Sequence, residues 1–106
     1  MPKYLVSANY AGEGIKGLLK EGGSSRKAAV EKLVGSMGGS VESMYYAFGE
    51  TDLYVIADMP DDASMTALAL TVGASGAVTL KTTVLMTPAE VDKAVKKTPN
   101  YSPPGQ

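Results

Sequence analysis

Residues 41–59 read VESMYYAFGETDLYVIADM, and two aromatic-rich runs in this stretch flank the turn Gly49-Glu50-Thr51-Asp52. Runs rich in aromatic and β-branched residues on either side of a short Gly- and Asp-containing segment are typical of a β-hairpin. A two-residue loop of Glu50 and Thr51 places Phe48 opposite Leu53. The sequence therefore predicts a hairpin with strands over residues 41–48 and 53–59.

Two further segments alternate apolar and polar side chains as strands do. They cover residues 3–9 and 78–86. Together with the helices around the hairpin, they give the order β-α-β-β-α-β plus a C-terminal helix. This order predicts an α+β fold of the ferredoxin-like, split βαβ type, with strand order 4-1-3-2.

The helices are predicted from apolar spacing and capping residues. A short helix is expected to end at Gly22-Gly23, and Ser24 or Ser25 is expected to cap a longer one. Asp61-Asp62 places acids at the start of a third helix, where the helix dipole favours them. Thr87 begins a capping box that predicts a fourth. We expect one domain over residues 1–97 and a Pro-rich extended tail over residues 98–106.

The hairpin register assigns strand side chains to two faces. The face under the helices is expected to hold Tyr4, Val6, Ala8, Met44, Tyr46, Phe48, Leu53, Val55, Ala57, Val78, Leu80, Thr82 and Val84. The opposite face is expected to hold Leu5, Ser7, Asn9, Ser43, Tyr45, Tyr54, Ile56, Asp58, Thr79, Lys81, Thr83 and Leu85. This second face is too apolar for a bare surface. It predicts a symmetric dimer in which two sheets pack together.

Composition excludes several classes of function. The chain has 106 residues, a net charge of −1, no His and no Cys. Without those two side chains there is no Ser-His-Asp triad and no Cys nucleophile, and a zinc site is not expected. No basic run points to nucleic acid, and no apolar segment points to a membrane. We therefore expect a cytoplasmic protein without a metal or cofactor.

The chain resembles the GYD family, small bacterial and archaeal proteins of the dimeric α+β barrel type. The family is named for a Gly-x-Tyr-Asp turn, and here Gly49 and Asp52 match while Thr51 replaces the Tyr. Residues 17–23, 46–49, 54–60 and 101–105 also look like the family. The resemblance implies the barrel fold and self-association. It implies no particular activity, because the family has no agreed one.

The turn has two interpretations. In the structural one, Gly49 permits an unusual backbone angle and Asp52 binds backbone amides, as turn acids do. In the functional one, Asp52 or Glu50 is a general base at the mouth of a pocket. The residue types by themselves favour the structural interpretation.

A second candidate site lies on the face away from the helices. Tyr54 and Lys81, with Asp52, are the candidate catalytic residues, because a Tyr beside a Lys can orient or deprotonate an enolisable or phenolic ligand. The candidate ligand-binding residues are Ser7, Asn9 and Tyr45 on this face and Tyr46 on the covered face. The structural alternative is a polar-lined dimer interface. If a ligand lies between sheet and helices instead, Tyr4, Tyr46 and Phe48 are expected to line its site.

The Gly-rich segment over residues 22–27 also has two interpretations. Gly22-Gly23-Ser24-Ser25-Arg26-Lys27 resembles a phosphate-binding entry to a helix. It lacks Walker spacing and follows a helix, so a capped helix start with solvated Arg26 and Lys27 is favoured.

These features support three functional hypotheses. The first is a homo-oligomer, dimeric or larger, that binds a small molecule. The second is a cofactor-free oxygenase or isomerase acting on an enolisable or phenolic compound. The third is a structural or assembly protein without a ligand.

Overall fold

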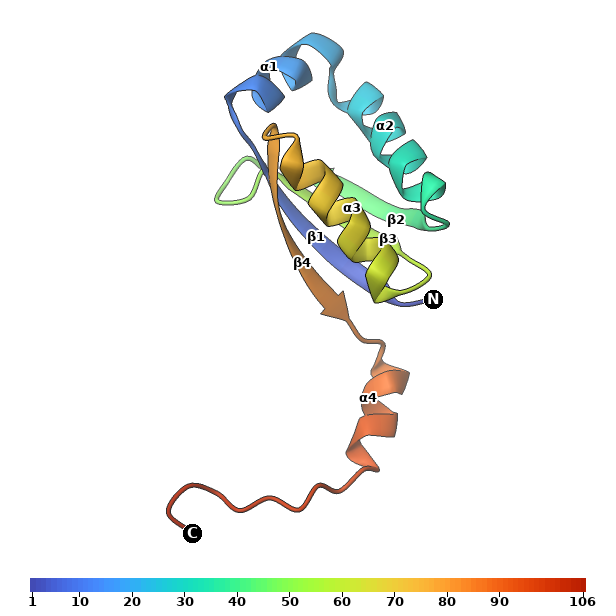
Figure 1. Ribbon diagram of the computed structural model, residues 1–106, viewed down its shortest axis with the longest axis vertical. Coiled ribbons are helices and arrows are strands. Elements are labelled where there is room, and N and C mark those ends of the chain that lie inside the picture. Colours follow the sequence, from blue (N-terminus) through green and yellow to red (C-terminus); the bar gives the residue numbers. More distant parts are fainter.

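The computed structural model describes residues 1–106 and has the predicted α+β architecture. Its elements are, in chain order, β1 (Lys3–Tyr10), α1 (Gly12–Glu21), α2 (Gly23–Ser36), β2 (Ser40–Tyr46), β3 (Leu53–Asp58), α3 (Asp62–Ala74), β4 (Val78–Leu85) and α4 (Pro88–Val95). The four strands form one antiparallel sheet in the order β2-β3-β1-β4, as predicted (Figure 1). The fold is therefore ferredoxin-like.

The helix starts follow the predicted caps, with one exception. The Asp61 carboxylate accepts a hydrogen bond from the Ser64 N–H at 2.7 Å, and Thr87 forms a capping box with Glu90. The start of α2 differs, because Gly22 and not a serine is its N-cap. Gly22 has φ +82° and also ends α1, so the two helices follow each other without a linker. A backbone with this φ and an extended ψ is open almost only to glycine.

The hairpin connection is longer than the two-residue loop expected. Tyr46 pairs with Leu53 and Met44 with Val55, so β2 ends at Tyr46 and residues 47–52 connect the strands. This register differs from the predicted one by two residues. Because side chains alternate with a period of two, a shift of two leaves Met44, Tyr45 and Tyr46 on their predicted faces. Phe48 instead lies in the loop and is exposed. A bulge between Val41 and Ser43 then brings Val41 opposite Ala57.

The loop conformation explains the shorter strand. The Ala47 N–H donates to the Asp52 carbonyl at 2.9 Å, which closes the loop behind Tyr46. Phe48, not Gly49, has the left-handed backbone, with φ +56°. The expectation that Gly49 supplies the unusual angle is therefore wrong. With this backbone conformation, the Phe48 ring stacks on the Tyr46 ring, with 5.8 Å between the ring centroids.

The core lies between the sheet and the two helices α2 and α3. Ten residues are buried and all are hydrophobic: Tyr4, Val6, Ala8, Val34, Leu53, Val55, Ala57, Met59, Met65 and Leu68. The core face predicted for β1 and β3 is thus confirmed. On the edge strand β4, Val78 and Leu80 pack against the core, whereas Thr82 is exposed and Val84 is 61% exposed.

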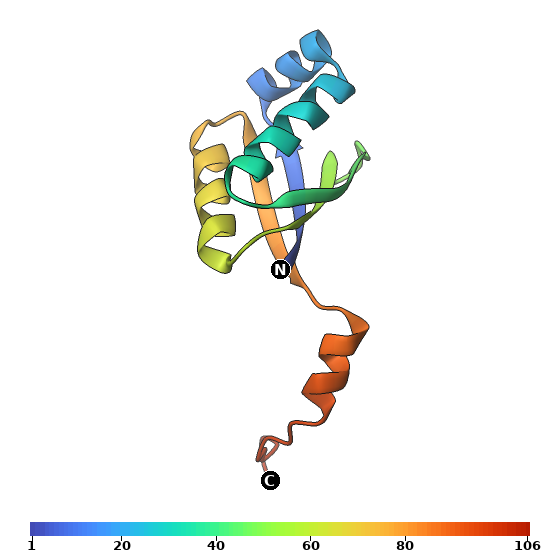
Figure 2. The same cartoon turned by 90° about the vertical axis from the view of Figure 1, so that its right-hand side faces the viewer.

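No helix covers the opposite face of the sheet, and α4 packs on none of it. α4 and the tail extend from the end of β4 away from the body (Figures 1 and 2). They account for the long dimension of the molecule, which measures 57 × 32 × 23 Å. α4 contains no buried residue, and its Val91 and Val95 are 46% and 73% exposed.

We expect Gly39→Ala to destabilise the fold by about 1–3 kcal/mol, because the new methyl group would overpack a filled site. A Cβ at Gly39 would lie 2.6 Å from the Met59 sulfur, and closer still to the Asp58 carbonyl oxygen. The matched control is Gly17→Ala in the middle of α1, where no atom lies within 4 Å. That change should stabilise by about 0.5–1 kcal/mol. Urea unfolding of both variants tests the pair, and equal midpoints would contradict the packing at Gly39.

Candidate functional site

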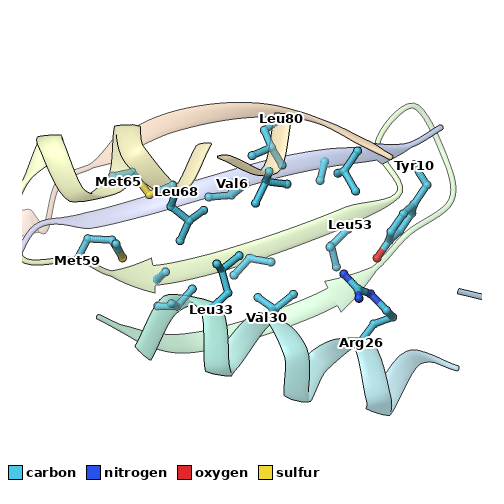
Figure 3. Close-up of a pocket in the computed structure, with 16 residues that line it drawn as sticks. Val6, Tyr10, Arg26, Val30, Leu33, Leu53, Met59, Met65, Leu68 and Leu80 are labelled. Carbon is cyan, nitrogen blue, oxygen red and sulfur yellow. The ribbon is translucent and has the colours of Figure 1, made fainter. Parts of the chain in front are cut away.

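An apolar cavity lies between α2, α3 and the covered face of the sheet. Its volume is about 80 Å³, and 15 of its 16 lining residues are hydrophobic. Val6 and Leu53 form its floor on the sheet, Val30 and Leu33 come from α2, and Leu68 comes from α3 (Figure 3). The even-numbered residues of β1 and the apolar stripe of α2 face each other here because each element buries its apolar side.

One end of the cavity is polar. Arg26 from α2 and Tyr10 from β1 lie there and point towards each other, whereas Met59 and Met65 lie at the far end (Figure 3). Arg26 is the only charged residue in the lining. Its side chain is 34% exposed and lies 3.6 Å from the carboxylate of Glu21. The cavity is therefore an apolar space with a single cation at its mouth.

Tyr46 completes the cluster at this mouth. Its hydroxyl donates to the Gly23 carbonyl at 3.0 Å, which ties the end of β2 to the start of α2. Burial raises the pKa of Tyr46, and the neighbouring Tyr10 hydroxyl raises it further, while the charge of Arg26 acts in the opposite direction. Tyr46 is therefore a neutral hydrogen-bond donor at physiological pH.

Sequence reasoning missed Tyr10 and misjudged Arg26. The predicted first strand ends at residue 9 and therefore leaves Tyr10 out. In the structure Tyr10 belongs to β1 and continues the alternation of Tyr4, Val6 and Ala8 on the covered face. Arg26 was expected to be solvated. It lies four residues before Val30, and therefore on the same side of α2 as the apolar stripe. Helical spacing was the signal that could have placed it at the cavity.

On the uncovered face, four of the predicted site residues form one row across all four strands. Tyr45 pairs with Tyr54, Tyr54 with Ser7, and Ser7 with Lys81. The next row contains Ile56 beside Leu5. No hydrogen bond links the side chains of Tyr54, Ser7 and Lys81, so the row has no preformed acid–base pair in the single chain. The row is polar and aromatic, and it lies beside apolar neighbours.

Asp52 and Asn9 lie at the end of the sheet and bind the backbone. The Asp52 carboxylate accepts from the Tyr10 N–H at 3.0 Å, and the Asp52 N–H lies 3.1 Å from the Ala8 carbonyl and 2.9 Å from the Asn9 side-chain oxygen. These contacts join the loop to β1. They support the structural interpretation of the turn, since the carboxylate is engaged with the main chain.

Of the residues expected to line a site between sheet and helices, Tyr46 alone lies near the cavity, beside Tyr10 and Arg26 at its mouth. None of Tyr4, Tyr46 and Phe48 is part of the cavity lining. Phe48 is 59% exposed, and the buried Tyr4 donates its hydroxyl to the carboxylate of Asp62 at the start of α3.

Two further findings concern the whole chain. No three acidic side chains are gathered in a way that would hold a metal ion. Measured by length and apolar character, none of the helices is able to cross a membrane.

Because Tyr4 and Asp62 are in contact, we expect the folded state to lose stability at alkaline pH. The hydrogen bond to Asp62, with burial and nearby negative charge, raises the pKa of Tyr4 from 10.0 to about 12. Because folding raises this pKa, the contact stabilises the folded state fully below about pH 10 and is lost as the pH rises through about 12.

We therefore expect Tyr4→Phe to be less stable than the wild type near neutral pH. The difference should shrink across that alkaline window, because only the wild type has this hydrogen bond to lose. Urea unfolding of both proteins in a pH series measures it. A difference that stays constant up to the highest pH would show that the hydroxyl contributes nothing through Asp62.

The chain matches a known family over most of its length. A family model described as the GYD domain matches residues 4–95, which span the chain from β1 to the end of α4. No curated protein and no solved structure matches the chain. The match confirms the predicted family, and the resemblance noted over residues 101–105 lies outside the matched range. The chain therefore belongs to the GYD domain family.

Proposed function

We propose that this protein is a homo-oligomer that binds a small molecule in the cavity between the sheet and the helices. The cavity itself is the observation that supports the proposal. Domain interiors are normally packed almost without voids. A concave space with an apolar lining and a few polar groups at one end is the usual form of a ligand site. Here those polar groups are Arg26, Tyr10 and Tyr46.

Self-association is supported by the uncovered face of the sheet. Tyr45 is 72% exposed and Tyr54 40% exposed, and they lie beside the half-buried Leu5 and Ile56. Only 10 of 106 residues are buried in the single chain, which is a small core for a domain of this length. A second copy packing its sheet on this face would form a dimeric α+β barrel and enlarge the buried apolar area.

The C-terminal helix supports association as well. α4 has eight residues and lies apart from the body, and isolated helices shorter than about 12 residues are marginal in water. Its exposed Val91 and Val95 offer an apolar side. Packing of α4 against a second copy would stabilise this helix and cover that side.

We expect Tyr45→Lys to weaken self-association by about tenfold or more, since it places a charge in the proposed sheet-to-sheet contact. Leu19→Lys is the matched control, because Leu19 is 82% exposed on α1 and outside that contact. Native mass spectrometry and sedimentation over a range of concentrations measure the effect. A wild type that is monomeric at micromolar concentration, or two variants that dissociate alike, would exclude this interface.

We expect Val30→Phe to abolish retention of a small molecule by filling the cavity. Ala29→Phe is the control, since Ala29 is exposed on the same helix. Native mass spectrometry of freshly purified protein detects a bound compound. Methyl NMR shifts of Leu33 and Leu68 under xenon report the empty cavity. A wild type with neither a bound compound nor a xenon response would contradict ligand binding.

A further inference from the structure

We infer that the cavity takes a short apolar molecule with one anionic head group, such as an aliphatic monocarboxylate, whose head binds Arg26. This inference rests on the proposed ligand-binding function and names its ligand class. The lining contains no carboxylate and one guanidinium, so the only charge that the cavity can neutralise is a negative one. A neutral apolar ligand would form no charge-assisted contact with the Arg26 guanidinium at the mouth.

The guanidinium is free to bind a head group. Arg26 donates no side-chain hydrogen bond in the structure, and its contact with Glu21 is a loose one at 3.6 Å. Glu21 is 46% exposed, and ion pairs exposed to this extent contribute little. The planar guanidinium carries five N–H donors in a geometry that matches a carboxylate with two parallel hydrogen bonds. An incoming carboxylate would therefore replace a weak contact with a stronger one.

The tyrosines at the mouth reinforce the preference. The Tyr10 hydroxyl lies beside that of Tyr46, and Tyr46 is held by its bond to the Gly23 carbonyl. Tyr10 points towards Arg26 in Figure 3, so a head group placed between them would lie next to the Tyr10 hydroxyl and the Arg26 guanidinium. Both groups are donors to an anion.

Acidic side chains outside the mouth limit the charge of the ligand. Glu13 and Glu21 of α1 line the depression that adjoins Arg26 and Tyr10 on the outer side. These carboxylates repel a second negative charge projecting outwards. The arrangement therefore favours a single head group drawn inwards over a phosphate ester or a dicarboxylate.

The size of the cavity limits the tail. Its volume of about 80 Å³ is about half that of the engineered cavity of about 150 Å³ that accepts benzene. Met59 and Met65 lie at the closed end, and flexible thioether side chains can adjust to a tail of a few carbons. A short aliphatic acid is therefore the best probe.

Three unbranched probes of five carbons each test the inference: pentanoate, pentanamide and pentylamine. We expect pentanoate to bind the wild type about tenfold or more tightly than pentanamide, since charge-assisted hydrogen bonds are about twice as strong as neutral ones. Pentylamine should bind most weakly. Methyl NMR shifts at Leu33 and Leu68 give the affinities and locate the probe in the cavity.

Three variants separate the roles of the charges. Arg26→Gln should remove the preference for the acid over the amide. Glu21→Gln should raise the affinity for pentanoate severalfold, because it removes both a competitor for Arg26 and a repelling charge. This second variant changes an exposed side chain, so the test does not depend on the folding of Arg26→Gln. Lys27→Gln is the matched control, since it removes a neighbouring exposed cation that does not line the cavity.

The outcomes distinguish the inference from the function it rests on. If pentanamide or pentylamine binds as tightly as pentanoate, the cavity binds ligands and the acid preference is wrong. If Lys27→Gln weakens pentanoate as much as Arg26→Gln does, general surface charge explains the binding and the inference is overturned. If no probe shifts the cavity methyls, the proposed function fails together with the inference.

Discussion

The register between the two central strands, β1 and β3, controls which of their side chains face the helices and which face away from them. Asp52 secures that register at one end, because its carboxylate holds the Tyr10 N–H and its own N–H faces the Ala8 carbonyl. With β1 and β3 locked in this way, Val6 lies opposite Val55 and the even-numbered residues of β1 face the helices. Tyr10 then comes last in that series and lies at the mouth of the cavity.

The cavity exists because the two covering helices and the sheet do not fill the space between them. α2 follows α1 directly through Gly22, and the Tyr46 hydroxyl holds its first turn at the Gly23 carbonyl. This anchoring brings the side of α2 that carries Arg26 and Val30 over the sheet. A cation on an otherwise apolar stripe then lies at the open end, where it keeps partial contact with water and avoids the desolvation that full burial of a charge would require.

The two faces of the sheet have different roles in the proposed assembly. The covered face holds the core and the cavity, while the uncovered face carries the row from Tyr45 to Lys81. A second copy on the uncovered face would leave the cavity mouth, on the helix side, open to solvent. The proposed ligand binding and the proposed association would therefore use different surfaces and different side chains.

Local patterns in the sequence determined the elements, their order and the faces of the strands. The alternation of Tyr4, Val6 and Ala8 set the core face, and Thr87 with Glu90 set the start of α4, because periodicity and capping act within a few residues. The face assignment survived the wrong loop length because the error was an even number of residues. Only the tertiary structure decided that Tyr10 and Arg26 meet, that Asp52 binds β1, and that α4 leaves the body. These features depend on residues distant in sequence, whose contacts follow from how the helices and the loop pack on the sheet.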